Sequence, residues 1–390
     1  FLEGAAIPAG AEDAYFVPAV SDQQASVYEH AARAIDRSLK VGVHGLPLMG
    51  SGDWNDGMNQ VGIEGRGESV WLAWFLCRLV ADFAPLAHQR GDHLRADRWT
   101  QAASGWQAAL QGQAWDGSWF KRAFFDDGQP LGASANPEGR IDLIAQAWAV
   151  LSNAAPLEQQ AQAMAAAEAL LVDVEVGLIR LLDPPLVRSL PSAGYIQAYP
   201  PGVRENGGQY THAGVWALMA QAQLAQTTVP DSATDASGAG DLVYRYLTYL
   251  SPAHRSAHPT RGPLYGLEPY VVAGDVYSQP PYAGRGGWSW YTGAAAWMHR
   301  AVLESIFGLS QRARSLSFKP CLPGHWPQAE LTLVRDARRL HFILMRATPN
   351  AALAAHASQH ARLLMPGQWL AWTDLPMQTC FVVPLLRDAL

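Results

Sequence analysis

The chain has 390 residues, enough to bury a large core, and it is 49% hydrophobic but only 16% charged. A net charge of −6 with no basic stripe argues against a nucleic-acid partner. The three cysteines are far apart and lack metal-ligand spacing, so we expect no metal or other cofactor and a reducing compartment, the cytoplasm.

Apolar residues at helical spacing predict a series of helices along most of the chain. The first covers residues 22–40, with Asp22 as its cap. The others are expected over residues 68–88, 93–111, 141–153, 157–172, 209–226, 240–250 and 292–308. The loops between them are long and rich in glycine, proline and aromatic residues, which indicates a toroid of paired helices with binding groups in its loops. No uninterrupted apolar run of about 18 residues occurs, so we expect no membrane span.

A polar loop, residues 50–58 with the sequence G-S-G-D-W-N-D-G-M, follows the first predicted helix. Carboxylates beside an indole are typical of a sugar site, because the aromatic face stacks on a pyranose while an acid reaches the glycosidic oxygen. A turn in which Asp and Asn accept helix N–H groups explains the same residues. The loop by itself leaves both interpretations open.

A second polar loop contains Arg204 and Glu205 between prolines and glycines. The pair either hydrogen-bonds sugar hydroxyls in a fixed geometry or forms an ion pair of little consequence at the surface. His212 follows in the first turn of a predicted helix, where backbone N–H groups and the helix dipole favour an anion. A core histidine is the alternative.

A third loop, residues 284–293 with the sequence G-R-G-G-W-S-W-Y-T-G, also runs into a predicted helix. Its glycines, followed by Thr292 and Gly293 at the helix start, predict a cradle for an oxyanion. It lacks the lysine of a nucleotide-binding P-loop. Its aromatic residues equally suit a packed toroid interior, and Asp275 and Tyr277 just before it support either the site or the fold.

From about residue 311 the apolar residues alternate with polar ones, which indicates β-strands. The alternating sets are Leu316 and Phe318, Ala329 to Leu333, Leu340 to Leu344, and Cys380 to Val383. We therefore expect a small β-domain over residues 311–390.

Four motifs, taken together, resemble a known family. They are H-G-L-P-L-M-G-S-G-D-W-N-D-G-M, G-R-G-E-S-V-W-L-A-W-F-L, Y-P-P-G-V-R-E-N-G-G-Q-Y-T-H-A-G-V-W and G-R-G-G-W-S-W-Y-T-G. In this order they resemble the inverting phosphorylases of glycoside hydrolase family 94, which include cellobiose and chitobiose phosphorylases. The loops are most similar to the C-terminal region of cyclic β-1,2-glucan synthases. The resemblance covers the chain to about residue 325.

The resemblance implies a mainly α fold, an (α/α)6 barrel over residues 1–310 that is N-terminally incomplete, followed by the small β-domain at 311–390. It implies that Asp56, the second Asp of D-W-N-D, is the general acid. The implied sugar contacts are Trp54, Arg204 and Glu205, and the implied phosphate ligands are His212, Thr292 and Gly293.

The implied activity is cleavage of a β-glucan, with β-1,2 linkages expected, by inorganic phosphate with inversion to α-glucose 1-phosphate. Phosphate is then a co-substrate and supplies the nucleophile, so the enzyme needs one acid. An inverting (α/α)6 hydrolase is an alternative, but it needs a second carboxylate roughly 6.5–9.5 Å away, and Asp53 is too near Asp56 in sequence. A non-catalytic glucan-binding module that controls chain length is another.

Fewer helices are predicted than a closed (α/α)6 barrel contains, and the family carries further domains ahead of the D-W-N-D motif. We therefore expect this chain to be the C-terminal part of a larger, membrane-associated synthase. Half a toroid leaves apolar helix faces uncovered, so we expect it to pair with the N-terminal remainder or with a second copy. Alone, it is expected to lack a complete site.

Overall fold

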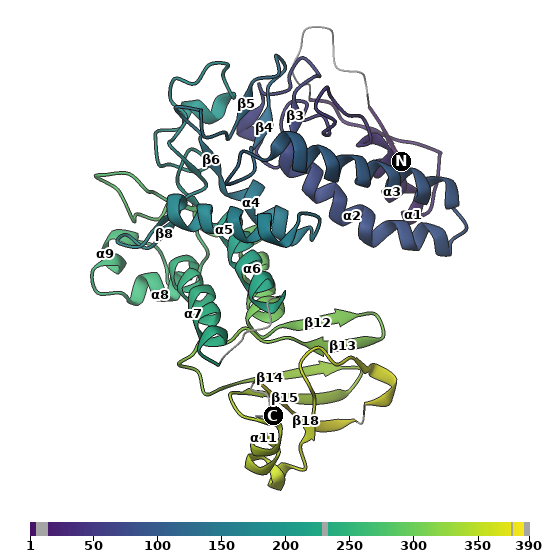
Figure 1. Cartoon of the computed structure of the whole chain (residues 1–390), viewed down its shortest axis with the longest axis vertical. Helices are drawn as coiled ribbons and strands as arrows, with labels where there is room; N and C mark the ends of the chain where they lie inside the picture. The colour runs from purple at the N-terminus through teal and green to yellow at the C-terminus, as the bar shows by residue number, and fades with distance from the viewer. Residues whose placement is uncertain (5–14, 228–232, 376, 386–390) are drawn as a thin grey trace. The chain divides into compact units, whose positions relative to one another are not determined.

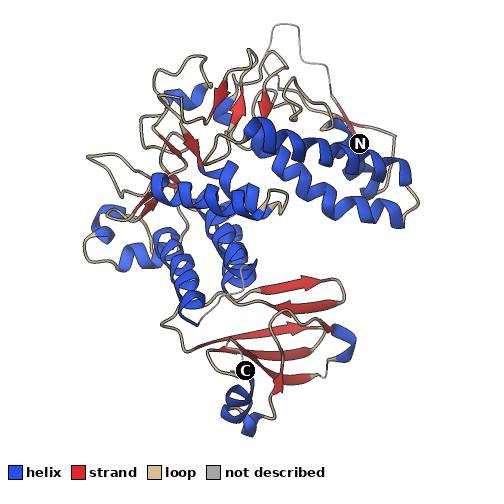
Figure 2. Cartoon of the chain, in the orientation of Figure 1, coloured by secondary structure: helices blue, strands red, loops and turns tan. Residues whose placement is uncertain are grey.

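The computed structural model describes residues 1–4, 15–227, 233–375 and 377–385 (Figure 1). The chain forms two compact units. The first consists of residues 1–159 and 183–200, and the second of residues 160–182 and 201–390. The described chain is mainly helical up to Ile306 and rich in strands after it (Figure 2). The predicted domain boundary near residue 310 stays a prediction.

Four helices organise the first unit: α1 (Val27–Arg37), α2 (Val70–Gln89), α3 (His93–Ala109) and α4 (Leu143–Leu151). Helices α2 and α3 lie side by side, as Figure 1 shows. The first helix begins later than predicted. The hydroxyl of Ser26, not Asp22, accepts the N–H of Glu29 and caps α1. The capping residue is the one directly before the first helical turn, whichever acceptors precede it.

Helix α2 is, within the described ranges, the one helix long and apolar enough to cross a membrane by length and composition alone. Half of its most apolar stretch is buried inside the protein, at 50%. Two of its indoles make edge contacts with other rings of the unit, Trp71 with Trp148 and Trp74 with Phe120. This packing is that of a core helix.

A small antiparallel sheet stands at the start of α2. Its strands are β3 (Glu68–Ser69), β4 (Ala123–Phe124) and β5 (Pro130–Leu131). Glu68 and Ser69 are both buried, and the Ser69 hydroxyl caps α2 by accepting the N–H of Leu72. The sheet thereby fixes the start of α2 beside β4.

The predicted helices of the second unit are confirmed as α5 (Leu157–Leu171), which begins just inside the first unit, α6 (Thr211–Thr227), α7 (Ala233–Leu250) and α10 (Thr292–Arg300). Two short helices, α8 (Pro252–Ala257) and α9 (Arg261–Tyr265), escaped prediction because they are too short to show periodicity. Strands β10 (Gln209–Tyr210) and β11 (Asp275–Val276) pair antiparallel, which brings the segments before α6 and α10 together.

The C-terminal strands form two sheets (Figure 2). One has the order β12 (Leu309–Arg312), β13 (Ser315–Phe318) and β17 (Leu370–Ala371). The other has the order β14 (Gln328–Arg335), β15 (Arg338–Met345), β18 (Gln378–Pro384) and β16 (Arg362–Leu363). All four alternating stretches of the sequence therefore lie in strands, as predicted.

Both faces of strand β15 are covered by other side chains. Phe342 contacts Phe318 and Phe381, with ring centroids 4.6 and 5.2 Å away. Its neighbour Ile343 packs instead with Ala352 of helix α11 (Pro349–Ala355). Successive side chains of a strand point to opposite faces, so the contacts of Phe342 and Ile343 lie on different faces of β15.

Candidate functional site

The two carboxylates of the D-W-N-D loop, both in the first unit, have opposite surroundings. Asp56 begins a 3-10 turn (Asp56–Met58), and its residue is exposed. The preceding Asn55 is buried and caps the turn, because its side-chain oxygen accepts the N–H of Gly57 at 3.0 Å. Asp56 is therefore held on a capped backbone with its side chain in solvent.

Asp53, in contrast, has a fully buried side chain. Its two carboxylate oxygens accept both terminal guanidinium nitrogens of Arg122, at 2.7 and 2.6 Å, and the Ser69 hydroxyl at 2.6 Å. Burial by itself would raise the pKa of Asp53, but the charge and hydrogen bonds of Arg122 outweigh it and hold that pKa below its ordinary value. Both oxygens of Asp53 are engaged, because they accept hydrogen bonds from Arg122, from the Ser69 hydroxyl and from the N–H of Asn55.

The same guanidinium faces a third residue. The Nε of Arg122 lies 3.4 Å from Oδ2 of Asp142, which caps α4 by accepting the N–H of Ile144 at 2.9 Å. Burial raises the pKa of Asp142 to about 6, although the charge of Arg122 works against that rise. This Asp53–Arg122–Asp142 cluster ties the D-W-N-D loop to the starts of α2 and α4.

Glu68 fixes the chain that leads into the loop. Its buried carboxylate accepts the backbone N–H groups of His44 and Leu46, and it lies 2.5 Å from Nδ1 of His44. Sequence reasoning assigned no role to Glu68, although it lies in one of the family motifs, and it missed Arg122 altogether. Arg122 stands 69 residues from Asp53 and outside every motif, so no local signal marked it.

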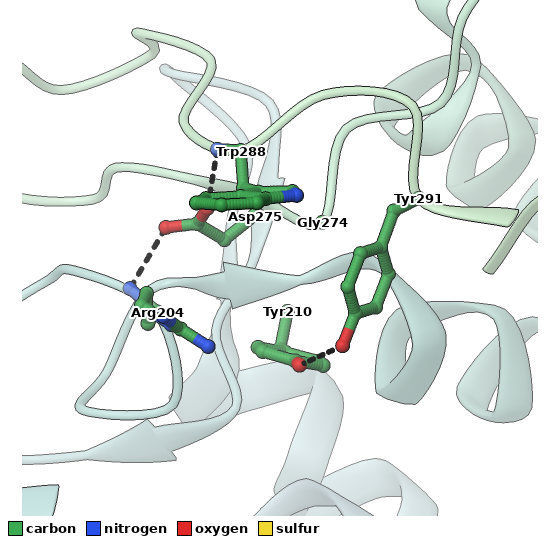
Figure 3. A pocket seen from close by; sticks show the side chains of 6 residues that line it. All are labelled: Arg204, Tyr210, Gly274, Asp275, Trp288 and Tyr291. Atoms are coloured by element: carbon green, nitrogen blue, oxygen red, sulfur yellow. Dashed lines mark hydrogen bonds between the residues drawn. The ribbon is translucent and has the colours of Figure 1, made fainter. Parts of the chain in front are cut away.

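Arg204 and Glu205 lie in the second unit and form an ion pair, with Nε and Oε2 3.4 Å apart. The Arg204 side chain is 40% exposed and that of Glu205 is 14% exposed. Burial raises the pKa of Glu205. Asp275 carries this loop, since its Oδ2 accepts the N–H of Arg204 at 2.8 Å while Oδ1 accepts the N–H of Trp288 at 3.2 Å (Figure 3). Asp275 thus joins the second and third polar loops.

Gly287 is required for this junction. A Cβ at this position would lie 2.2 Å from Oδ1 of Asp275, closer than any side chain tolerates. Gly287 of the third loop therefore allows the backbone to pack closely on the Asp275 carboxylate. The sequence left open whether Asp275 supports the site or only the fold. Its hydrogen bonds show that it holds the backbone of the two loops that form the site.

The starts of α6 and α10 lie next to one another. Tyr210 directly precedes α6 and Tyr291 directly precedes α10. Their hydroxyls share a hydrogen bond of 2.7 Å (Figure 3). His212 is the second residue of α6, and Thr292 and Gly293 are the first two of α10 and are exposed. The starts of the two helices that carry the predicted anion ligands thus lie together within one unit, and the binding of a common anion by these ligands stays a prediction.

His212 contributes no positive charge to that neighbourhood. Its ring packs against Trp216 and Trp297, with centroids 4.4 and 5.8 Å away. Burial lowers the pKa of His212 to about 4, so the ring is neutral near pH 7. His212 can therefore offer an anion an N–H donor but no charge, and Thr292 and the helix N-termini can offer further donors.

A cavity of about 230 Å³ opens between the second and third loops. It is lined by Arg204, Tyr210, Gly274, Asp275, Trp288 and Tyr291. Three of its six lining residues are aromatic, and Figure 3 shows the Trp288 indole beside the Asp275 carboxylate. No cluster of three or more histidine, cysteine or acidic side chains is placed to hold a metal ion in the described part of the chain.

The comparisons with known proteins agree with these motifs. The catalytic-domain model of the glycosyl hydrolase 94 superfamily matches residues 12–308. A cyclic beta-(1,2)-glucan synthase NdvB of Rhizobium meliloti (strain 1021) is 43% identical over 328 residues, which are 84% of this chain and 11% of that protein. A 3-O-beta-D-glucopyranosyl-beta-D-glucuronide phosphorylase of Paenibacillus borealis is 32% identical over 83% of this chain and 40% of that protein.

A solabiose phosphorylase of the same organism is 31% identical over 82% of this chain and 40% of its own length. This chain therefore spans less than half the length of each of these relatives. Among solved structures, a sialidase matches with a TM-score of 0.53 and 13% identity, over 78% of this chain and 26% of that one. That likeness concerns the fold alone.

Proposed function

The chain belongs to the glycosyl hydrolase 94 superfamily, and from this we propose that it is a phosphorylase module that cleaves a β-glucan with inorganic phosphate. The relatives of this family include several phosphorylases and a cyclic beta-(1,2)-glucan synthase, which supports a β-1,2-linked substrate. The product is α-glucose 1-phosphate, formed with inversion. We further propose that the helices belong to an (α/α)6 barrel and that the module works in the cytoplasm as part of a larger synthase.

The observation that carries the proposal is the opposite state of the two aspartates in one motif. Arg122 neutralises Asp53 and occupies both of its oxygens, whereas Asp56 is exposed on a capped turn. An inverting hydrolase needs an acid and a separate base to activate water. Asp53 cannot serve as that base. Within this motif Asp56 is the carboxylate left exposed, and a single acid suits a reaction in which phosphate brings its own nucleophilic oxygen.

In the proposed mechanism, Asp56 donates its proton to the glycosidic oxygen as the bond to the anomeric carbon breaks. Trp54, Arg204 and Glu205 hold the sugar. Phosphate sits at the starts of α6 and α10, where His212, Thr292 and Gly293 donate hydrogen bonds, and one of its oxygens attacks the anomeric carbon from the opposite face. The neutral imidazole and helix N-termini orient the anion without fixing a counter-charge on it.

The chain spans 11% of the glucan synthase and 40% of the first phosphorylase. We therefore propose that full activity requires residues beyond this chain, supplied by further sequence or by a second copy. Light scattering of the 390-residue chain, alongside its phosphorolysis rate, tests this. A stable monomer with robust phosphorolysis would show that these residues suffice.

The test of the function is product analysis with β-1,2-glucan and phosphate, carried out on the full protein to which this chain is proposed to belong. We expect phosphate-dependent release of glucose 1-phosphate, which Asp56→Asn reduces by roughly 10²–10⁴ because proton delivery is lost. Asp127→Asn, at another exposed loop aspartate of the first unit, is the matched control and should keep the wild-type rate. Free glucose formed without phosphate would instead favour the hydrolase alternative. Glucan binding with neither product would favour the non-catalytic module.

A further inference from the structure

The cavity between the second and third polar loops has an aromatic wall that the proposed mechanism does not use. Trp288 is 69% exposed although it is the largest side chain at this cavity. Tyr210 and Tyr291 form another part of the lining and are joined by their hydroxyl pair (Figure 3). An aromatic face in water gains nothing for folding, and because Trp288 lines a cavity, its face is available to stack on a ligand there.

The backbone that carries Trp288 is fixed on both sides. Its N–H donates to Oδ1 of Asp275 at 3.2 Å, and its carbonyl accepts the N–H of Gly274 at 2.5 Å. The adjacent N–H of Gly287 donates to the backbone carbonyl of Asp275 at 2.9 Å. The indole is therefore presented on a rigid frame, and little order has to be gained when a ligand binds.

The chemistry of the lining selects a neutral, hydroxylated ring. Indole and phenol faces pack on the C–H face of a pyranose. The half-exposed guanidinium of Arg204, which the proposed mechanism places at the reacting sugar, has further donors for hydroxyls of the adjoining unit. The charges of the Asp275 carboxylate and the Arg204 guanidinium in this lining offset each other, which suits a neutral ligand. At about 230 Å³ the cavity is smaller than the pockets that hold drug-sized ligands, and it suits one monosaccharide unit.

We propose that this cavity is a glucosyl subsite in which Trp288 stacks on one sugar unit of a β-glucan chain, with Tyr210 and Tyr291 lining its other side. The identity of the sugar as glucose rests on the proposed function. The subsite binds chain already linked to the reacting unit, so it sets affinity for longer oligosaccharides. Trp288 acts by binding and takes no part in proton transfer.

Isothermal titration of the 390-residue chain with a β-1,2-linked gluco-oligosaccharide, without phosphate, tests the subsite. We expect Trp288→Ala to weaken binding roughly five- to tenfold and Trp288→Phe to restore part of the loss, since a phenyl face still stacks. Trp369→Ala is the matched control. Trp369 is 41% exposed and lies under Arg312, at 4.2 Å, in the β-rich segment, so its loss should leave the affinity unchanged.

Unchanged affinity in a folded Trp288→Ala protein, with thermal midpoint and circular dichroism like those of the wild type, would overturn the proposal. So would the absence of oligosaccharide binding by the wild type, or Trp288-dependent binding of inorganic phosphate alone. The outcome is separate from that of the catalytic proposal. Trp288-dependent glucan binding by this chain, with no phosphorolysis by the full protein to which it is proposed to belong, would refute the phosphorylase assignment and leave the subsite standing.

Discussion

Replacement of Arg122 by methionine should destabilise the first unit severely. The Arg122 side chain is 1% exposed and lies between the carboxylates of Asp53 and Asp142, whose side chains are 0% and 3% exposed. Methionine fills much of the space but carries no charge. Two buried carboxylates then face each other without a cation, and Asp53 loses both of its guanidinium hydrogen bonds.

The expected loss is about 3–5 kcal/mol, the cost of removing one partner of a buried ion pair. The free energy of unfolding of an ordinary domain is roughly 5–15 kcal/mol, so this loss is a large fraction of the total stability. The double variant Asp53→Asn/Arg122→Met should lose less than Arg122→Met alone, because it no longer leaves a bare carboxylate at position 53. Acidic pH should also reduce the loss of stability of Arg122→Met relative to the wild type, since protonation of the two carboxylates removes the buried negative charge.

Urea unfolding followed by tryptophan fluorescence measures these differences, and hydrogen exchange over residues 50–58 reports the loop itself. Arg78→Met provides the control, because Arg78 pairs with Asp82 on the exposed face of α2, where the two side chains are 48% and 64% exposed. That pair contributes at most about 1 kcal/mol. If Arg122→Met lost no more than Arg78→Met, the view of the Asp53–Arg122–Asp142 cluster as the support of the D-W-N-D loop would be refuted.

Two further predictions concern the titrating groups. Burial raises the pKa of Asp142 from 3.8 to about 6, so the folded state binds its proton more tightly than the unfolded state, and stability falls as pH rises through this window. As the pH rises from 4 to 7, the free energy of unfolding of Asp142→Asn should therefore increase by about 3 kcal/mol relative to that of the wild type, as measured by urea titration. A difference that does not change with pH would contradict this. His212→Ala should raise the KM for phosphate roughly tenfold or more through loss of a hydrogen bond to a charged group, with glucan affinity unchanged by calorimetry. Because burial lowers the pKa of His212 to about 4, that effect should be similar from about pH 6 to 8, and an effect confined to acidic pH would show that the charged ring binds instead.

The sequence by itself determined the elements whose signal is local. Helix α2 follows from its apolar run after Ser69, and β15 and β18 follow from strict alternation, since a period of two or of 3.6 residues is written into the residues concerned. The polar loops between elements were equally visible, because glycine, proline and charged residues interrupt both periods. Short α8 and α9 were missed, because five or six residues do not establish a period.

Only the tertiary structure decided which residues of those loops are free to act. Asp53 and Asp56 stand three positions apart in one motif, and nothing local distinguishes them. Arg122, 69 residues away, engages the first and leaves the second in solvent. Asp275 joins the Arg204 loop to Trp288 in the same way, across 71 residues. The protonation state and availability of a side chain depend on burial and on partners brought together by folding, and these are properties of the assembled chain.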